Sequence, residues 1–196
     1  YAAWFNDKPE LDILHIMGLF DRPVDERALN ALLVTPATKG LRGKLKAFLF
    51  GTGIRGLTSR LTNLSFEDRQ DALEDLRHAR LIADSDPTAP TYLDAHPLVR
   101  EHFGERLQQN NPDAWREAHS RLHDHYKTQA PELPDTLEEM TPLFLAVAHG
   151  CYAGRYQETY ELYRHRVRRQ NEYFTTKQLG AFASELAVLS GFFELP

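Results

Sequence analysis

The sequence predicts a mainly helical protein in which a small hairpin interrupts a succession of helices. Apolar residues recur at helical spacing in most segments, and proline or capping residues stand where helices would begin. Short extended runs occur on either side of one turn that is rich in Asp and Pro. The 196 residues suffice for one domain or two small ones, and we expect two, over residues 8–107 and 111–196.

The first part contains signals for three helices and then a hairpin. The helices are expected at Glu10–Phe20, at Val24–Leu33 and from the capping box that begins at Ser65. Two strands, Arg80–Ala83 and Thr91–Ala95, would flank the turn. The order helix, helix, helix, hairpin is that of a winged-helix domain.

After residue 97 the chain is expected to be entirely helical. Helices are expected at about residues 98–109, 112–127, 137–151, 154–170 and 176–190. Asn111 is a good cap for the second of these, with Pro112 in the first turn. The last would bury one stripe of apolar side chains, namely Leu179, Phe182, Leu186 and Leu189. Short glycine turns between helices are typical of an α-solenoid.

The overall composition excludes several classes of protein. A net charge of −5 gives no general attraction to nucleic acid or to an anionic membrane. The single cysteine excludes an internal disulfide framework and suits a reducing cytoplasm. No apolar run is long enough to span a bilayer. The aromatic start and the end at Leu195 and Pro196 indicate a fragment of a longer protein.

His96 stands where the second expected strand meets the next helix. Pro97 suits the first helical turn and disfavours helical geometry at His96 itself. The amides at a helix start favour an anion, so a histidine here is well placed to meet a phosphate. Because the sequence has no loop that would hold a phosphate, the phosphate must come from elsewhere.

A glycine motif and a basic segment precede the third helix. Gly51–Gly56 matches G-x-G-x-x-G, but Leu57–Leu64 is too short for the crossover helix of a dinucleotide-binding unit, so we interpret the motif as a loop. Five basic residues lie between positions 41 and 60, without an acidic one: Arg42, Lys44, Lys46, Arg55 and Arg60. They could touch phosphate or an acidic partner, although a solvated loop needs neither.

Two other charged segments bear on nucleic acid binding. The third helix has five acidic residues (Glu67, Asp68, Asp71, Glu74 and Asp75), so it would repel DNA as a recognition helix. A basic helix end contains Arg164, His165, Arg166, Arg168 and Arg169. Cations at a helix C-terminus complement the helix dipole, and a contact with an acidic partner or nucleic acid stays open.

The remaining candidates do not assemble an enzyme. His119 and His123 have the spacing of two metal ligands on a helix, and Asp124 and His125 follow. No third ligand lies at close spacing, so we interpret this group as a surface cluster and expect no metal site. Cys151 is expected to be a packed thiol. No serine lies in a nucleophile elbow, and we expect no catalytic residue.

Three runs resemble the winged-helix domain of STAND-class NTPases, the signalling ATPases that include NB-ARC and NACHT proteins. They are Leu14–Val24, Leu73–Ile82 and Leu93–Glu101. The stretch at His96 is similar to the Met-His-Asp motif of that family, with Ala95 and Pro97 in place of the Met and the Asp. The resemblance implies that His96 contacts the β-phosphate of ADP in the intact protein and keeps it inactive.

The second part resembles the tetratricopeptide-like arm that follows such a domain. Gly154–Tyr156 fits the turn between the helices of a repeat, while Thr159 and Arg166 replace the expected small residues. The resemblance implies a regulatory segment of a bacterial signalling or defence ATPase, which couples an ADP-bound off state and an ATP-bound on state to a sensor arm. The P-loop and the Mg²⁺-binding acid are not in this sequence, so the chain itself is not expected to be an enzyme.

The expected partners follow from this resemblance. They are the parent protein's own nucleotide-binding domain, which would hold ADP or ATP with Mg²⁺, and a protein or ligand on the helical arm. Oligomerisation of the full-length protein stays open. Two other hypotheses for the function also stay open: a winged-helix transcription regulator that binds DNA, and a protein-interaction scaffold that uses the helical arm.

Overall fold

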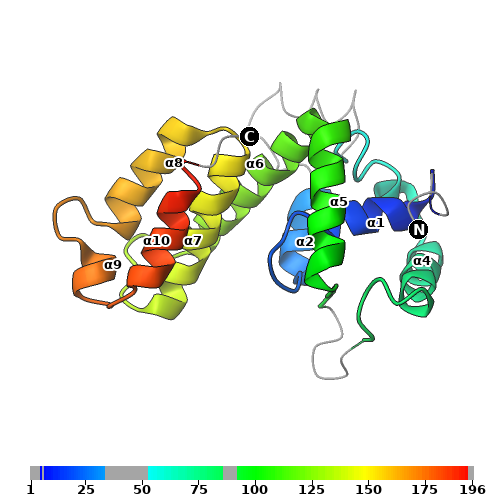
Figure 1. Ribbon diagram of the computed structural model, residues 1–196, viewed down its shortest axis with the longest axis horizontal. Coiled ribbons are helices and arrows are strands. Elements are labelled where there is room, and N and C mark those ends of the chain that lie inside the picture. The colour runs from blue at the N-terminus through cyan, green and yellow to red at the C-terminus, as the bar shows by residue number, and fades with distance from the viewer. Residues whose placement is uncertain (1–4, 6, 34–52, 86–91, 194–196) are drawn as a thin grey trace. The chain divides into compact units, whose positions relative to one another are not determined.

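The computed structural model describes residues 5, 7–33, 53–85 and 92–193, and it is mainly helical, as the sequence predicts (Figure 1). The chain divides into two compact units, residues 1–115 and 116–196. In the part of the chain that the structure describes, no helix is long and apolar enough to cross a lipid bilayer.

The first unit is built around one buried helix. Its elements are α1 (Pro9–Met17), α2 (Glu26–Leu33), a 3-10 turn (Leu61–Asn63), α4 (Phe66–His78) and α5 (Pro97–Asn110). Helix α1 packs against α4 and α5 and contributes Leu14, Ile16 and Met17 to the core. Leu76 and Leu107, from α4 and α5, are also fully buried. The core of this unit is therefore built mainly from apolar side chains.

The chain leaves α1 where α5 passes closest to it. A Cβ atom on Gly104 would lie 2.6 Å from the carbonyl oxygen of Gly18, and a Cβ on Gly18 would lie 2.3 Å from the amide nitrogen of Gly104. Both distances are far inside van der Waals contact and involve backbone atoms, which cannot move aside cheaply. Glycine at these two positions is what allows the close approach.

One buried ion pair fixes the segment before α4 to α1. The Asp12 side chain is 2% exposed and accepts hydrogen bonds from Nε and Nη2 of Arg60, both at 2.8 Å. Burial raises the pKa of Asp12, and the Arg60 guanidinium opposes this rise. Arg60, one of the five basic residues predicted to lie in a solvated loop, is therefore half-buried and paired.

The expected hairpin of Arg80–Ala83 with Thr91–Ala95 is not shown. Among the described residues the extended pairing is limited to one antiparallel bridge, between Val24 and Leu93, and the Ala83 amide donates to the Asp94 carbonyl at 2.8 Å. Leu93 therefore uses its hydrogen bonds on the segment before α2, while residues 86–91 of the turn lie outside the described part.

The second unit is a series of antiparallel helices. They are α6 (Pro112–Gln129), α7 (Leu137–Tyr152), α8 (Tyr156–Leu162), a π-helical turn (Tyr163–Val167), α9 (Phe174–Lys177) and α10 (Phe182–Ser190). Helix α6 begins in the first unit, with the Asn111 side chain capping it as predicted. Helix α7 packs against both α8 and α10. The α7–α8 turn has Gly154 in the left-handed region, with φ of 74°.

The expected helix over 176–190 is wrong in two respects. Gly180, with φ of 66°, separates α9 from α10. The inner stripe also differs, because Phe182 and Leu186 are 68% and 70% exposed, while Glu185 and Val188 are buried. After the break at Gly180, α10 is rotated about its axis so that the face with Glu185 is buried. A 2.5 Å hydrogen bond from the Tyr163 hydroxyl to Glu185 stabilises this rotation.

Candidate functional site

His96 is the residue immediately before α5 and caps that helix. Its ring Nδ1 accepts a hydrogen bond from the Leu98 amide at 3.2 Å, and its carbonyl accepts from the Val99 and Arg100 amides. Pro97 follows at the first helical position, where it has no N–H to leave unpaired. The first amides of α5 are thus satisfied by His96 itself, and the imidazole is the group of this turn that can reach a ligand.

The cap also sets the proton position of His96. A neutral imidazole whose Nδ1 accepts a hydrogen bond carries its proton on Nε2. The His96 side chain is exposed. The Nε2–H of this exposed side chain is a hydrogen-bond donor, which suits an anionic oxygen of a ligand held by another domain.

An ion pair holds the segment that carries His96. One oxygen of Asp94, Oδ1, accepts a hydrogen bond from the Ala95 amide at 2.8 Å and pairs with Nη2 of Arg100, one turn into α5. Burial lowers the pKa of Arg100, and the charge of Asp21 opposes this shift. Together with the bridge at Leu93, the ion pair fixes the backbone on both sides of His96.

The described half of the glycine motif forms a packed turn. Ile54 is buried, its amide donates to the Thr58 hydroxyl at 2.6 Å, and its carbonyl accepts from Leu57 and Thr58. This turn agrees with the interpretation of the motif as a loop. Gly51 lies outside the described residues, as do Arg42, Lys44 and Lys46 of the basic segment.

Helix α4 presents its acidic residues to solvent. All five of them are exposed: Glu67, Asp68, Asp71, Glu74 and Asp75. The helix begins as predicted, because the Ser65 hydroxyl accepts a hydrogen bond from the Asp68 amide at 3.1 Å. An exposed face of this charge opposes the approach of a phosphate backbone.

The interpretation of His119 and His123 as a surface cluster is wrong. Both side chains are fully buried between α6 and α7. Nδ1 of His119 lies 2.8 Å from Nδ1 of His149, and Nδ1 of His123 lies 2.7 Å from the Ala146 carbonyl oxygen. Burial lowers the pKa of His119 well below its usual range, and the neighbouring His149 adds to this shift. These histidines form part of the packing between two helices.

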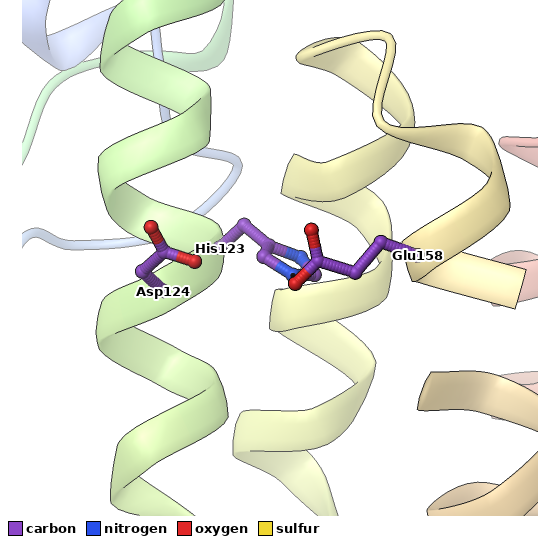
Figure 2. Close-up of side chains that lie close together, drawn as sticks. All are labelled: His123, Asp124 and Glu158. Atoms are coloured by element: carbon purple, nitrogen blue, oxygen red, sulfur yellow. Dashed lines mark ion pairs between the residues drawn. The ribbon is translucent and has the colours of Figure 1, made fainter. Parts of the chain in front are cut away.

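His123 also borders a charged cluster that links α6 to α8 (Figure 2). Its Nε2 is 3.7 Å from Oε1 of Glu158, and Asp124 lies beside it on α6. Two cations pair with these carboxylates. Lys127 Nζ lies 2.9 Å from Oε1 of Glu158, and Arg155 reaches Oε2 of Glu158 at 2.6 Å and Oδ1 of Asp124 at 2.9 Å. Burial raises the pKa of Glu158, but the hydrogen bonds and charges of Lys127 and Arg155 outweigh it and lower the pKa to about 2.

Two arginines of the basic helix end at Arg164–Arg169 contact the end of another helix and the segment that follows it. Arg166 is 9% exposed and donates hydrogen bonds to four carbonyl oxygens at the end of α6 and just after it, those of Lys127, Ala130, Pro131 and Glu132. Arg169 reaches the Pro134 carbonyl and the Asp135 carboxylate. The expected dipole role is thus only part of the account, since two of these cations hold the α6–α7 connection, whereas Arg164 and His165 are exposed.

Sequence reasoning missed the residues that complete these clusters. Glu158 is 35 positions from His123, and the hydrogen bonds of Arg166 go to backbone carbonyls, which have no signature in a sequence. Cys151 is buried, as predicted. Comparison with models of protein families, with curated proteins and with solved structures found no match.

Proposed function

We propose that this chain is the winged-helix and helical-arm segment of a larger bacterial STAND ATPase. In that protein, His96 would donate a hydrogen bond to the β-phosphate of ADP bound by another domain. The observation that carries the proposal is the exposed imidazole of His96, whose Nδ1 accepts the capping hydrogen bond of α5. The resemblance of the three runs around Leu14, Leu73 and Leu93 supports the class of protein.

The arrangement of the chain suits a part that responds to nucleotide rather than one that hydrolyses it. His96 offers a hydrogen-bond donor at an anchored helix start. The helical unit 116–196 would act as the sensor arm. A coupling of about 1–3 kcal/mol between nucleotide and arm is typical of such switches.

The test uses the longer protein that the proposal requires. The His96→Ala variant should retain less ADP after gel filtration and show raised basal signalling, because the off state loses one phosphate contact. The exposed neighbour Leu98 provides a matched control, Leu98→Ala, which should retain ADP like the parent protein. Equal ADP retention and equal signalling in parent and His96→Ala would refute the proposed role.

A protein-interaction scaffold is the second candidate, and one observation favours it. Helix α10 exposes Phe182 and Leu186 on one face, and Phe193 shortly after it is 82% exposed. Apolar side chains gathered in this way are typical of a contact surface. A photo-crosslinking amino acid at position 182 should then capture one defined partner, whereas the same amino acid at the exposed position 164 should not.

A DNA-binding experiment separates the transcription regulator from the proposed function. Fluorescence anisotropy with duplex DNA at two salt concentrations should show no tight, salt-dependent binding, because α4 presents acidic side chains where a recognition helix needs basic or neutral ones. Tight binding that weakens steeply with salt would favour the transcription regulator over both other candidates.

A further inference from the structure

The imidazole of His123 is held in the orientation of a metal ligand. Its Nδ1–H donates to the Ala146 carbonyl at 2.7 Å, so the neutral ring has its lone pair on Nε2. Nε2 is buried and has no hydrogen-bond partner in the described part of the chain. A backbone carbonyl on the far nitrogen is the usual arrangement behind a metal-bound histidine, because it fixes the ring and its tautomer.

The neighbouring carboxylates stand at a distance that suits a shared cation. Nε2 of His123 and Oε1 of Glu158 are 3.7 Å apart, which is too long for a hydrogen bond. Two ligand atoms on one tetrahedral zinc ion stand about 3.4 Å apart, given zinc bond lengths of about 2.0–2.2 Å. Asp124 supplies a third ligand atom, and all three atoms lie within 4.8 Å of one another.

The imidazole of His123 occupies space that a side chain at position 150 would otherwise fill. A Cβ on Gly150 would lie 2.6 Å from Nδ1 of His123 and 2.2 Å from the Thr159 hydroxyl. Gly150 in α7 therefore permits His123 to lie between α6 and α7 while its Nε2 faces Glu158 on α8. Figure 2 shows the imidazole and the Glu158 carboxylate directed toward each other.

We propose that His123, Asp124 and Glu158 bind a divalent transition-metal ion, for which Zn²⁺ is the best match. One imidazole and two carboxylates form a donor set that zinc accepts, with water in the remaining position. This inference is independent of the proposed role of His96.

Lys127 and Arg155 compete with the metal for the two carboxylates. The Lys127 side chain is 38% exposed and can move its ammonium into water when a metal takes Oε1 of Glu158. Arg155 keeps its hydrogen bonds to the carbonyl and hydroxyl of Ser120, at 3.1 and 3.0 Å. The metal would thus replace one ammonium ion and tie α6 to α8. Removing Lys127 should therefore strengthen metal binding, an effect that a purely structural ion-pair network does not predict.

The proposal is tested by titrating the tag-free chain with Zn²⁺ alone, in competition with a chromophoric chelator. One ion should bind per chain, and Glu158→Gln and Asp124→Asn should each weaken binding at least tenfold. Both side chains are partly exposed, at 41% and 51%, so these variants should fold, as circular dichroism would verify. The Lys127→Met variant should bind more tightly than the parent chain.

Glu161→Gln provides the matched control, because Glu161 is an exposed acid one turn further along the chain and should not affect the titration. Thermal melting gives a second readout, since Zn²⁺ should raise the melting temperature of the parent chain but not that of Glu158→Gln. Absence of a saturable site, or equal zinc affinity in the parent, Glu158→Gln and Glu161→Gln, would overturn the proposal.

Discussion

The two units of this chain differ in how many polar side chains they bury. In the described part of the first unit the candidate ligand-binding group, His96, is on the surface, and four polar side chains are buried, namely Glu10, Asp12, Thr58 and Arg100. In the shorter second unit eight polar side chains are buried among the described residues, including His119, His123, Thr159, Arg166 and Glu185. A polar group at the surface stays solvated, so its placement costs little free energy and it can contact another domain. Buried polar groups must instead find hydrogen-bond partners within the unit.

Removing Arg166 should have the largest effect, and only on the second unit. In Arg166→Ala four carbonyl oxygens lose their donor, and the free energy of unfolding should fall by about 3 kcal/mol or more, because each buried unsatisfied group costs about 1–3 kcal/mol. Arg164→Ala, at an exposed site in the same π-helical turn, should change it by less than about 0.5 kcal/mol. Urea denaturation followed by circular dichroism would measure both, and equal effects would contradict the structural role of Arg166.

Crowding the contact at Gly104 should weaken the first unit instead. Gly104→Ala gains about 1 kcal/mol of helix propensity, but its Cβ would meet the Gly18 backbone at 2.6 Å, and overpacking of this kind costs about 1–3 kcal/mol. We expect a net loss of stability, measured as reduced hydrogen-exchange protection of the α1 and α5 amides. Gly191→Ala, where the nearest atom is 3.5 Å away, should be neutral or stabilising. A stabilising Gly104→Ala would show that α1 and α5 do not pack this closely.

Acid should weaken both units through buried histidines. Burial, aided by the charges of Arg106 and Arg60, lowers the pKa of His15 in α1 to about 4, and burial also lowers the pKa of His119 in α6. As the pH falls, the unfolded chain takes up these protons first, so stability is full above about pH 6.5 and is lost toward pH 4. Hydrogen exchange at pH 7 and pH 5, corrected for intrinsic rates, should show reduced protection of both helices. Unchanged protection at pH 5 would mean that these rings are protonated freely in the folded state.

Replacing His96 should have the smallest effect on stability. The His96→Ala variant loses one capping hydrogen bond at an exposed position, which costs about 0.5–1 kcal/mol. Its melting temperature should therefore stay within a few degrees of that of the parent chain. A large drop would assign His96 a role in folding and would remove the contrast between a surface group in one unit and buried groups in the other.

The helix starts could be predicted because their signals are local. Ser65 and Asn111 stand next to the amides that they cap, Pro97 occupies the first position of its helix, and α4, α5 and α6 begin where these residues predict. The rotation of α10 could not be predicted, because it depends on the left-handed Gly180 and on the bond from Tyr163 to Glu185. A stripe of apolar residues indicates a helix but does not show which face the rest of the chain will cover.

The candidate sites divide in the same way. The position of His96 at a helix start follows from Pro97 alone, whereas the hydrogen bond that the Leu98 amide donates to its ring cannot be predicted from the sequence. The cluster around His123 could not be predicted from the sequence, because Glu158 comes close to His123 only after the chain turns at Gly154. The small residue that leaves space for the imidazole is Gly150. Contacts between residues far apart in the chain leave no spacing to recognise.

The most direct test of the functional account is the rate at which ADP leaves the longer protein that contains this chain. A fluorescent ADP analogue can be bound and then chased with unlabelled ADP, in the parent protein, His96→Ala and Leu98→Ala. We predict dissociation about tenfold faster in His96→Ala, since a hydrogen bond to a charged group contributes about 1.5–3 kcal/mol, and no change in Leu98→Ala. Equal dissociation rates in all three proteins would contradict a contact between His96 and the nucleotide.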